Sequence, residues 1–159
     1  MDSGEILSLA TFVKRIEDPV NRVVAADATG TQRYFRTGDA AGVFGLELEL
    51  RKNLLLNNDE DPMLAVGFNG SYTFTEQDLK DVSGTFSTAF DRDTEELEGA
   101  SKWVFNADIA YNPTFGNYKP SATLVASYFS DRIFSIGSGS LGNIVEKSVT
   151  ALDFVWKSP

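Results

Sequence analysis

The sequence contains no cysteine and no histidine. Disulfide bonds, thiolate nucleophiles, a Ser-His-Asp triad and zinc sites built from these ligands are therefore excluded. No stretch comes near the roughly 18 apolar residues that a membrane-spanning helix needs. The segment from Met1 to Glu5 is acidic and lacks the basic start and apolar run of a signal peptide. Bases are also scarce, because 14 Lys and Arg stand against 23 Asp and Glu, and this balance argues against nucleic acid as a partner.

What the sequence has is alternation with a period of two, the spacing that places side chains on the two faces of a β-strand. In residues 43–51 the even positions are apolar and the odd positions are small or charged. Residues 64–75, 102–112 and 149–157 repeat this pattern, and residues 5–15 and 121–132 show it less cleanly. None of these segments keeps a helical spacing over its length. We therefore expect an all-β fold with about six antiparallel strands.

The connections between these segments alternate in length. Residues 16–42, 76–101 and 131–148 form long connections, and residues 53–63 and 112–120 form shorter ones with turn residues. Short turns at one end and long loops at the other are typical of an up-and-down β-barrel in an outer membrane. The pattern predicts an antiparallel up-and-down meander that is part of a transmembrane β-barrel.

Alternation alone does not say which face is wet, so a soluble β-barrel that binds a small apolar ligand stays open as an alternative. Three details favour the membrane. The polar faces carry Gly, Ala, Ser and Asn as well as charge, aromatic residues gather toward strand ends, and the apolar faces have the length that a tilted strand needs to cross a bilayer. Bacterial membrane barrels start at about eight strands. Free sheet edges cannot lie in lipid, so we expect six strands to be part of a larger barrel.

Short stretches of the chain also follow a family pattern. Residues 45–52 read Gly-Leu-Glu-Leu-Glu-Leu-Arg-Lys, like a G-x-E-L-E-x-R-K strand, and residues 128–133 are similar to a Y-x-x-x-G-D-R-I strand in which Ser130 replaces the usual glycine. Residues 12–20, 68–72 and 152–157 match in order and spacing. Together these stretches resemble the late barrel region of TonB-dependent outer-membrane receptors, particularly those of Bacteroidota.

The resemblance implies that residues 1–159 are a partial β-barrel domain with no plug domain and with the final strands missing. It implies active uptake of a nutrient by the parent receptor: a siderophore, cobalamin, a glycan or a peptide. The implied partners are the remainder of the barrel, the plug, outer-membrane lipid and the TonB system that supplies energy. The implied location is the outer membrane. An isolated piece of this kind is also expected to self-associate through its free strand edges.

Polar residues of the expected strands are the candidate functional residues. Glu47 and Glu49 share a face with Arg51, and they read better as lumen-lining charges than as a catalytic pair. No nucleophile, base and orienting group occur together, so we expect neither an enzyme nor a cofactor. The long connections are where we expect ligand selectivity to lie. The predicted lumen-facing residues are Glu47, Glu49, Arg51, Asn69, Asn106 and Asp108.

Two further motifs have simpler explanations. Residues 137–142 match G-x-G-x-x-G, but a short β-branched segment follows where a dinucleotide site needs a helix, so a flexible Gly/Ser loop is the better interpretation. Residues 91–98 carry five acids, which calcium would favour, but they lack the glycine of an EF-hand loop. We expect a solvated loop there and no metal site.

Overall fold

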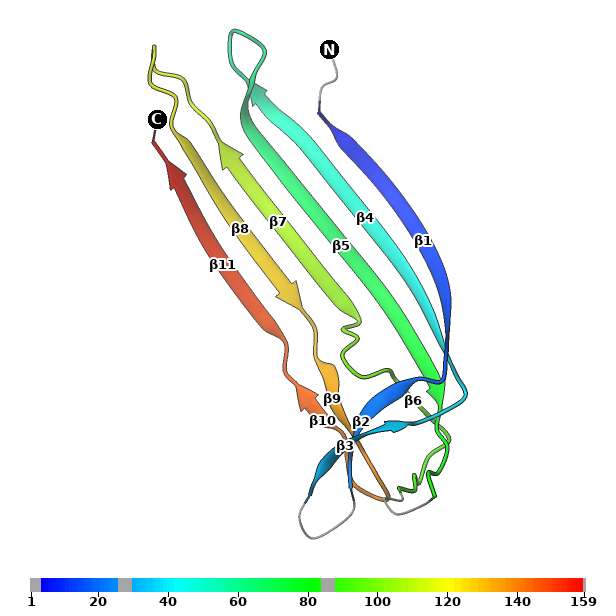
Figure 1. Ribbon diagram of the computed structural model, residues 1–159. Coiled ribbons are helices and arrows are strands. Elements are labelled where there is room, and N and C mark those ends of the chain that lie inside the picture. Colours follow the sequence, from blue (N-terminus) through cyan, green and yellow to red (C-terminus); the bar gives the residue numbers. More distant parts are fainter. Residues whose placement is uncertain (1–3, 26–29, 84–87, 159) are drawn as a thin grey trace.

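The computed structural model describes residues 4–25, 30–83 and 88–158, and most of them belong to one antiparallel sheet (Figure 1). Residues 26–29 and 84–87, which fall in two of the expected loops, lie outside the described residues. The strands follow one another in chain order across the sheet. They are β1 (Ile6–Glu17), β4 (Ala40–Leu56), β5 (Pro62–Asp78), β7 (Trp103–Tyr111), β8 (Ser121–Phe129) and β11 (Val149–Lys157). The predicted up-and-down meander of six strands is confirmed.

The strand boundaries differ from the expected ones at two places. Strands β4 and β5 each run for 17 residues, which is longer than their alternating segments. The segment 121–132 is not a single strand, because β8 ends at Phe129 and a new strand begins at Arg132. The Asp131 carboxylate at this corner binds Lys147 Nζ at 2.8 Å and accepts a hydrogen bond from the Ser148 amide at 2.7 Å. These contacts lie where the chain leaves β8.

The three long connections, which we expected to be long loops, contain further short strands. A four-stranded sheet has the order β10 (Ile144–Glu146), β9 (Arg132–Gly137), β2 (Val20–Val24) and β3 (Gln32–Arg36). Strands β2 and β9 pair in parallel, which joins the first long connection to the third. The second connection contributes β6 (Thr94–Glu95), which pairs with β5. We call the described residues within 18–39, 79–101 and 130–148 together the cap.

The cap holds the small apolar core of the described residues. Val23, Leu79, Ile133 and Ile136 are buried together, and Phe35 and Phe90 pack against them. Each of the three long connections contributes two of these six side chains. The connections therefore fold as one unit because each supplies part of a shared core.

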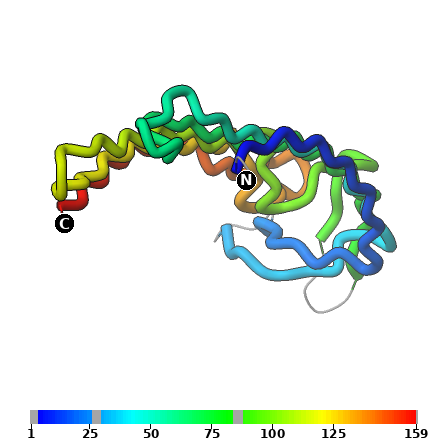
Figure 2. The backbone as a smooth tube through the Cα atoms, turned by 90° about the horizontal axis from the view of Figure 1, so that it is seen from above, coloured from blue at the N-terminus to red at the C-terminus, as the bar shows by residue number. Residues whose placement is uncertain are grey.

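The main sheet is curved, and the cap lies on its concave side at one end (Figure 2). We call that end the cap end, and we call the opposite end, where β4 turns into β5 and β7 into β8, the hairpin end (Figure 1). None of the described residues forms a helix that is long and apolar enough to cross a membrane.

Candidate functional site

The cross-strand register places the six predicted residues on a single face of the main sheet. Directly opposed residues of an antiparallel pair project to the same side. Glu47 lies opposite Ser71, which is two residues from Asn69 on β5 and so projects to the same side. Glu47 therefore belongs to the same face as the other five residues. We call this the polar face. Two rows cross it, the first formed by Glu49, Asn69 and Asn106 and the second by Arg51, Gly67 and Asp108.

The polar face has room for its longer side chains because glycines lie between them. A Cβ at Gly67 would collide with the carboxylate of Asp108, so Asp108 occupies the space that Gly67 leaves open. Arg51 Nε lies 3.1 Å from Glu49 Oε1 on the exposed surface. A surface ion pair of this kind contributes at most about 1 kcal/mol, so these charges are available to a binding partner.

The other side of the sheet, the apolar face, carries large exposed hydrophobic side chains. Leu7 is 78% exposed and Leu152 is 68% exposed, although both lie within strands. Such a wide apolar surface marks contact with lipid or with another protein. Its central positions are filled by leucine, phenylalanine and isoleucine, among them Leu46, Leu48, Leu50, Phe68, Phe105, Ile109, Leu124 and Phe154.

Aromatic residues mark both ends of the apolar face. At the cap end, the rings of Tyr72 and Trp103 lie 4.6 Å apart and the rings of Trp103 and Phe105 lie 5.6 Å apart. At the hairpin end, Tyr111 and Trp156 both lie opposite Ala122 on the intervening strand. Tyr and Trp favour the boundary between lipid and water, so two such groups indicate two boundaries.

The cap covers the cap end of the polar face. Thr75 and Gln77 are polar-face residues of β5, and both are buried. The Leu97 amide donates to Thr75 Oγ1 at 3.1 Å, and Gln77 Nε2 donates to the Glu96 carbonyl at 3.1 Å. Asn21 Nδ2 also donates to Gln77 Oε1 at 2.8 Å. Sequence reasoning missed these contacts because their residues are far apart in the chain.

A second polar cluster joins the second and third connections, and it corrects part of each of the two loop interpretations. Arg92 Nη2 donates to the Gly137 carbonyl at 3.1 Å and to Asn143 Oδ1 at 2.7 Å. Asn143 Nδ2 donates to Glu95 Oε2 at 2.8 Å, so this part of the acidic run is paired and largely shielded from solvent. Ser138 is also buried, so the Gly/Ser segment begins as a packed part of the cap, whereas Leu141 further along it is 42% exposed.

A partly buried cation with two aromatic rings lies elsewhere on the cap. The guanidinium of Arg22 lies 4.1 Å from the ring centre of Phe134 and 5.3 Å from that of Tyr34. Arg22 Nη2 donates to the Tyr34 hydroxyl at 2.7 Å, and Arg22 Nε lies 3.6 Å from Glu98 Oε1. This hydrogen bond and the nearby acid raise the pKa of Arg22, so its charge is permanent. The group presents a fixed cation beside partly exposed rings.

Ion pairs on the cap lower the pKa values of several acids. The hydrogen bond from Lys80 lowers the pKa of Asp39, and Arg36 adds to the effect. The pKa of Asp131 is lowered by Lys147 and by the amide of Ser148. All these acids stay ionised at neutral pH. Among the described residues no cluster of three or more acidic side chains is placed to hold a metal ion.

The comparisons with known proteins agree with this geometry. Residues 2–153 match the family model for a TonB dependent receptor-like beta-barrel. Comparisons with curated proteins and with solved structures gave no significant match. Members of this family are transporters of the outer membrane and not enzymes. The chain therefore belongs to the TonB-dependent receptor-like β-barrel family.

Proposed function

We propose that this chain forms part of the barrel wall of an outer-membrane receptor of the Bacteroidota type that takes up a nutrient with energy from the TonB system. The transported class is a siderophore, cobalamin, a glycan or a peptide. The observation that carries the proposal is the curvature of the main sheet. Because the cap packs on Thr75 and Gln77, the concave side is the polar face and the convex side is the apolar face.

In this proposal the polar face lines the lumen and the apolar face contacts lipid. Glu47, Glu49, Arg51, Asn69, Asn106 and Asp108 then face the interior, where a plug domain would lie. Exposed amides and weakly paired charges suit this role because they can form hydrogen bonds with a plug or with water.

The proposal also requires further strands. Strands β1 and β11 are the two ends of the sheet order, and each has one neighbour among the described residues. Unpaired backbone groups cannot lie in the hydrocarbon layer, so both edges must pair with other strands of the same barrel. Residues 1–159 would then be a partial barrel domain. In isolation its two edges would favour self-association.

The cap is the proposed site of ligand selection, because it lies over the polar face at one end of the sheet. Arg22 with Tyr34 and Phe134 is the best-formed candidate for ligand contact. Loops and caps at the mouth of a rigid scaffold commonly carry recognition residues. Polar-face residues nearer the hairpin end would then contact the ligand only after it has passed the cap.

The alternative of a soluble barrel around an apolar ligand is not favoured. Such a barrel would need the apolar side chains on the concave side, where they could enclose a ligand. They lie instead on the convex side, and Leu9 and Phe154 are 74% and 67% exposed there.

Fractionation of the source cells with an antibody against this chain tests the proposal. The expected result is a band several times larger than 17.4 kDa in the outer-membrane fraction. Deleting the gene should then stop growth on one of the four nutrient classes, and deleting the TonB system should have the same effect. A band at the size of this chain in the soluble fraction would contradict both the location and the larger barrel.

A further inference from the structure

The strand β3 forms one edge of the cap sheet, because among the described residues it pairs with β2 alone. The Thr37 amide donates to the Pro19 carbonyl at 3.0 Å, so these residues form a hydrogen-bonded pair at the end of the ladder. Such pairs recur at every second residue of an antiparallel ladder, so Phe35 and Arg33 also bond to β2. The backbone groups of the alternate residues therefore point away from β2, and these residues are Gln32, Tyr34 and Arg36.

This edge is regular enough to accept another strand. Within the part of the chain that the structure describes, no backbone hydrogen bond joins Gln32, Tyr34 or Arg36 to a segment on the outer side of β3. The strand contains no proline, and its register with β2 runs without a bulge. Native proteins usually cover or interrupt an edge of this kind. The edge of β3 therefore presents a row of alternating donors and acceptors to a binding partner.

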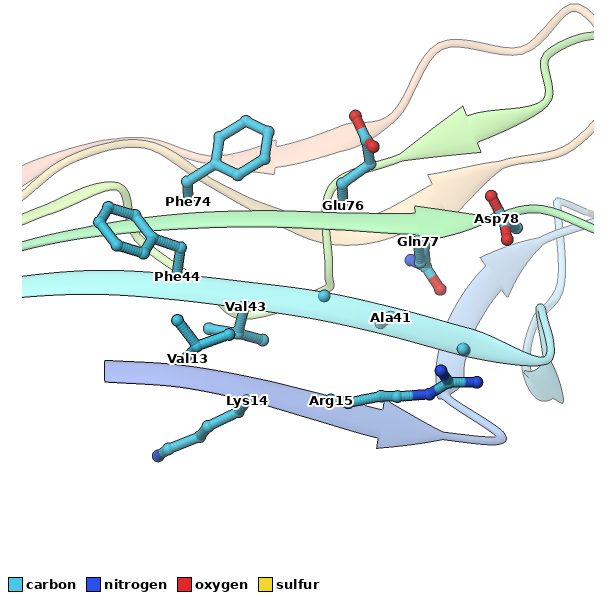
Figure 3. Close-up of a pocket in the computed structure, with 12 residues that line it drawn as sticks. Val13, Lys14, Arg15, Ala41, Val43, Phe44, Phe74, Glu76, Gln77 and Asp78 are labelled. Atoms are coloured by element: carbon cyan, nitrogen blue, oxygen red, sulfur yellow. The ribbon is translucent and has the colours of Figure 1, made fainter. Parts of the chain in front are cut away.

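A buried polar cluster fixes β2 and β3 to the main sheet. Asn21 Nδ2 donates to Thr37 Oγ1 at 2.6 Å and to Gln77 Oε1 at 2.8 Å. Thr37 Oγ1 donates to Gln77 Oε1 at 2.9 Å, and all three side chains are buried. In Figure 3, Gln77 projects from β5 to the opposite side of the sheet from Phe74 and Glu76. The edge of β3 is thus held in place on the concave side before any partner binds.

The edge of β3 borders the space that a closed barrel would enclose. Figure 2 shows β3, in light blue, along the side of the cap that lies farther from the main sheet. The concave side of a barrel wall faces the lumen, so a ligand that enters through the cap end passes this edge.

Tyr34 adds a side-chain surface beside the edge. Its side chain is 63% exposed, and Arg22 Nη2 holds its hydroxyl group through a hydrogen bond of 2.7 Å. A strand added to β3 would place one of its own side chains directly opposite Tyr34. Aromatic and β-branched residues form favourable cross-strand pairs with an aromatic ring. Tyr34 therefore favours a partner strand with such a residue at this position.

Deepening the uptake function proposed above, on which this inference rests, we propose that the transported nutrient is a peptide that binds in extended form as an added strand on β3. The peptide backbone pairs with the outward amides and carbonyls of Gln32, Tyr34 and Arg36. Among the four nutrient classes, the peptide is the one whose backbone repeats a donor and an acceptor at the spacing of a β-strand. An aromatic or β-branched side chain of the peptide packs on the Tyr34 ring.

The test uses the complete receptor, purified in detergent and immobilised. The probes are a pool of synthetic heptapeptides of random sequence and the same pool with every backbone amide N-methylated, which removes the donors of an added strand. Retained peptides are identified by mass spectrometry. Gln32→Pro removes one outward amide donor of β3 and no bond to β2. Asn58→Pro is the control, because it places a proline in the turn between β4 and β5 at the hairpin end.

We expect wild type to retain peptides rich in aromatic or β-branched residues from the first pool and none from the N-methylated pool. Gln32→Pro should weaken binding of the most strongly retained peptide by about tenfold, since one hydrogen bond is lost. Asn58→Pro should bind as wild type does. Retention of neither pool, equal retention of both pools, or an equal effect of the two prolines would overturn the inference.

Amide hydrogen exchange of wild type gives a second readout that depends on no variant. The amides of Gln32, Tyr34 and Arg36 should exchange rapidly in the free receptor and slowly with peptide bound, while those of Arg33 and Phe35 are protected in both states. Protection of all five amides without peptide would show that another part of the receptor already covers the edge, and would overturn the inference.

Fractionation of the source cells separates the two proposals. Wild-type receptor outside the outer membrane would sink the proposed function itself. Receptor that lies in the outer membrane and supports growth on a siderophore, cobalamin or a glycan, but retains no peptide, would overturn only the peptide site on β3.

Discussion

At the scale of single residues, the main sheet is organised by small residues that make room for large ones. The ring of Phe12 lies over Gly45 on the neighbouring strand, so a Cβ at Gly45 would collide with three atoms of that ring. The pairing fills a gap in the sheet with an aromatic side chain and covers a backbone that glycine would leave bare.

This packing predicts that alanine substitutions at two glycines of β4 change stability by different amounts. Gly45→Ala should lower the free energy of unfolding by about 1–3 kcal/mol, because the new methyl group displaces the Phe12 ring. Gly42→Ala should have little effect, since the nearest atom to a Cβ there is the Glu76 carbonyl oxygen at 4.0 Å. Thermal unfolding of the two variants in the same detergent measures the difference. Equal melting temperatures would show that the ring moves aside at no cost.

The ion pair of Asp39 predicts a pH dependence for the cap. Because Lys80 lowers the pKa of Asp39 in the folded state, the pair stabilises the cap above the ordinary pKa of aspartate. The stabilisation is lost as the pH falls below about 4, through the lowered folded-state value. Asp39→Asn should therefore melt at a lower temperature than wild type at neutral pH, and the two should converge in acid.

Asp59→Asn is the control for this experiment. Asp59 lies in the turn between β4 and β5, where its amide donates to Asn57 Oδ1 at 2.9 Å and its carboxylate has no ion pair among the described residues. Its melting curve should follow wild type at every pH. A gap between Asp39→Asn and wild type that persists in acid would mean that the pair acts through something other than its charge.

Sequence reasoning identified the faces of these residues but not their partners. Alternation assigned Glu47, Asn69 and Asp108 to polar positions, and the structure places them on one face. The position of Phe12 over Gly45 depends on the register between strands, which a single strand pattern does not contain.

At the scale of elements, the long strands are determined by a local sequence pattern, whereas the cap strands are determined by contacts between distant parts of the chain. The six long strands follow a period of two over nine or more residues, which is why the sequence predicts them. The cap strands are short, and β2 and β9 pair in parallel across more than 100 residues of chain, as in the hydrogen bond from Ser138 Oγ to the Val24 carbonyl. Such pairs are set by the shared core and leave no local pattern.

The shared core predicts that the cap unfolds as one unit. Ile136→Ala, at a fully buried position, should cost about 2–5 kcal/mol of cap stability. The loss should appear in all three connections, as faster amide hydrogen exchange at Arg22, Leu79 and Ile133, while the middle of β5 keeps its protection.

Leu141→Ala is the control for this prediction, because Leu141 is 42% exposed on the same connection as Ile136. It should leave exchange unchanged in the other two connections. If Ile136→Ala affected only the third connection, the three connections would be separate loops and the cap would not be a single structure.

At the scale of the whole molecule, one curved sheet separates two environments. The convex apolar face is edged by aromatic residues at both ends, and the concave polar face is closed at one end by the cap. Alternation in the sequence predicted both faces, but it left open which of them was wet. The direction of curvature favours the membrane interpretation, and this direction follows from where the cap packs.

The natural absence of cysteine allows the most direct measurement of this account. Glu49→Cys and Leu50→Cys are adjacent positions of β4 on opposite faces, and each would be placed alone in the complete receptor in outer-membrane vesicles. We predict that a charged, water-soluble maleimide labels Glu49→Cys, and that Leu50→Cys reacts only with a lipid-soluble reagent. Rapid labelling of Leu50→Cys by the charged reagent, with Glu49→Cys protected, would contradict the assignment of the polar face to the lumen and of the apolar face to lipid.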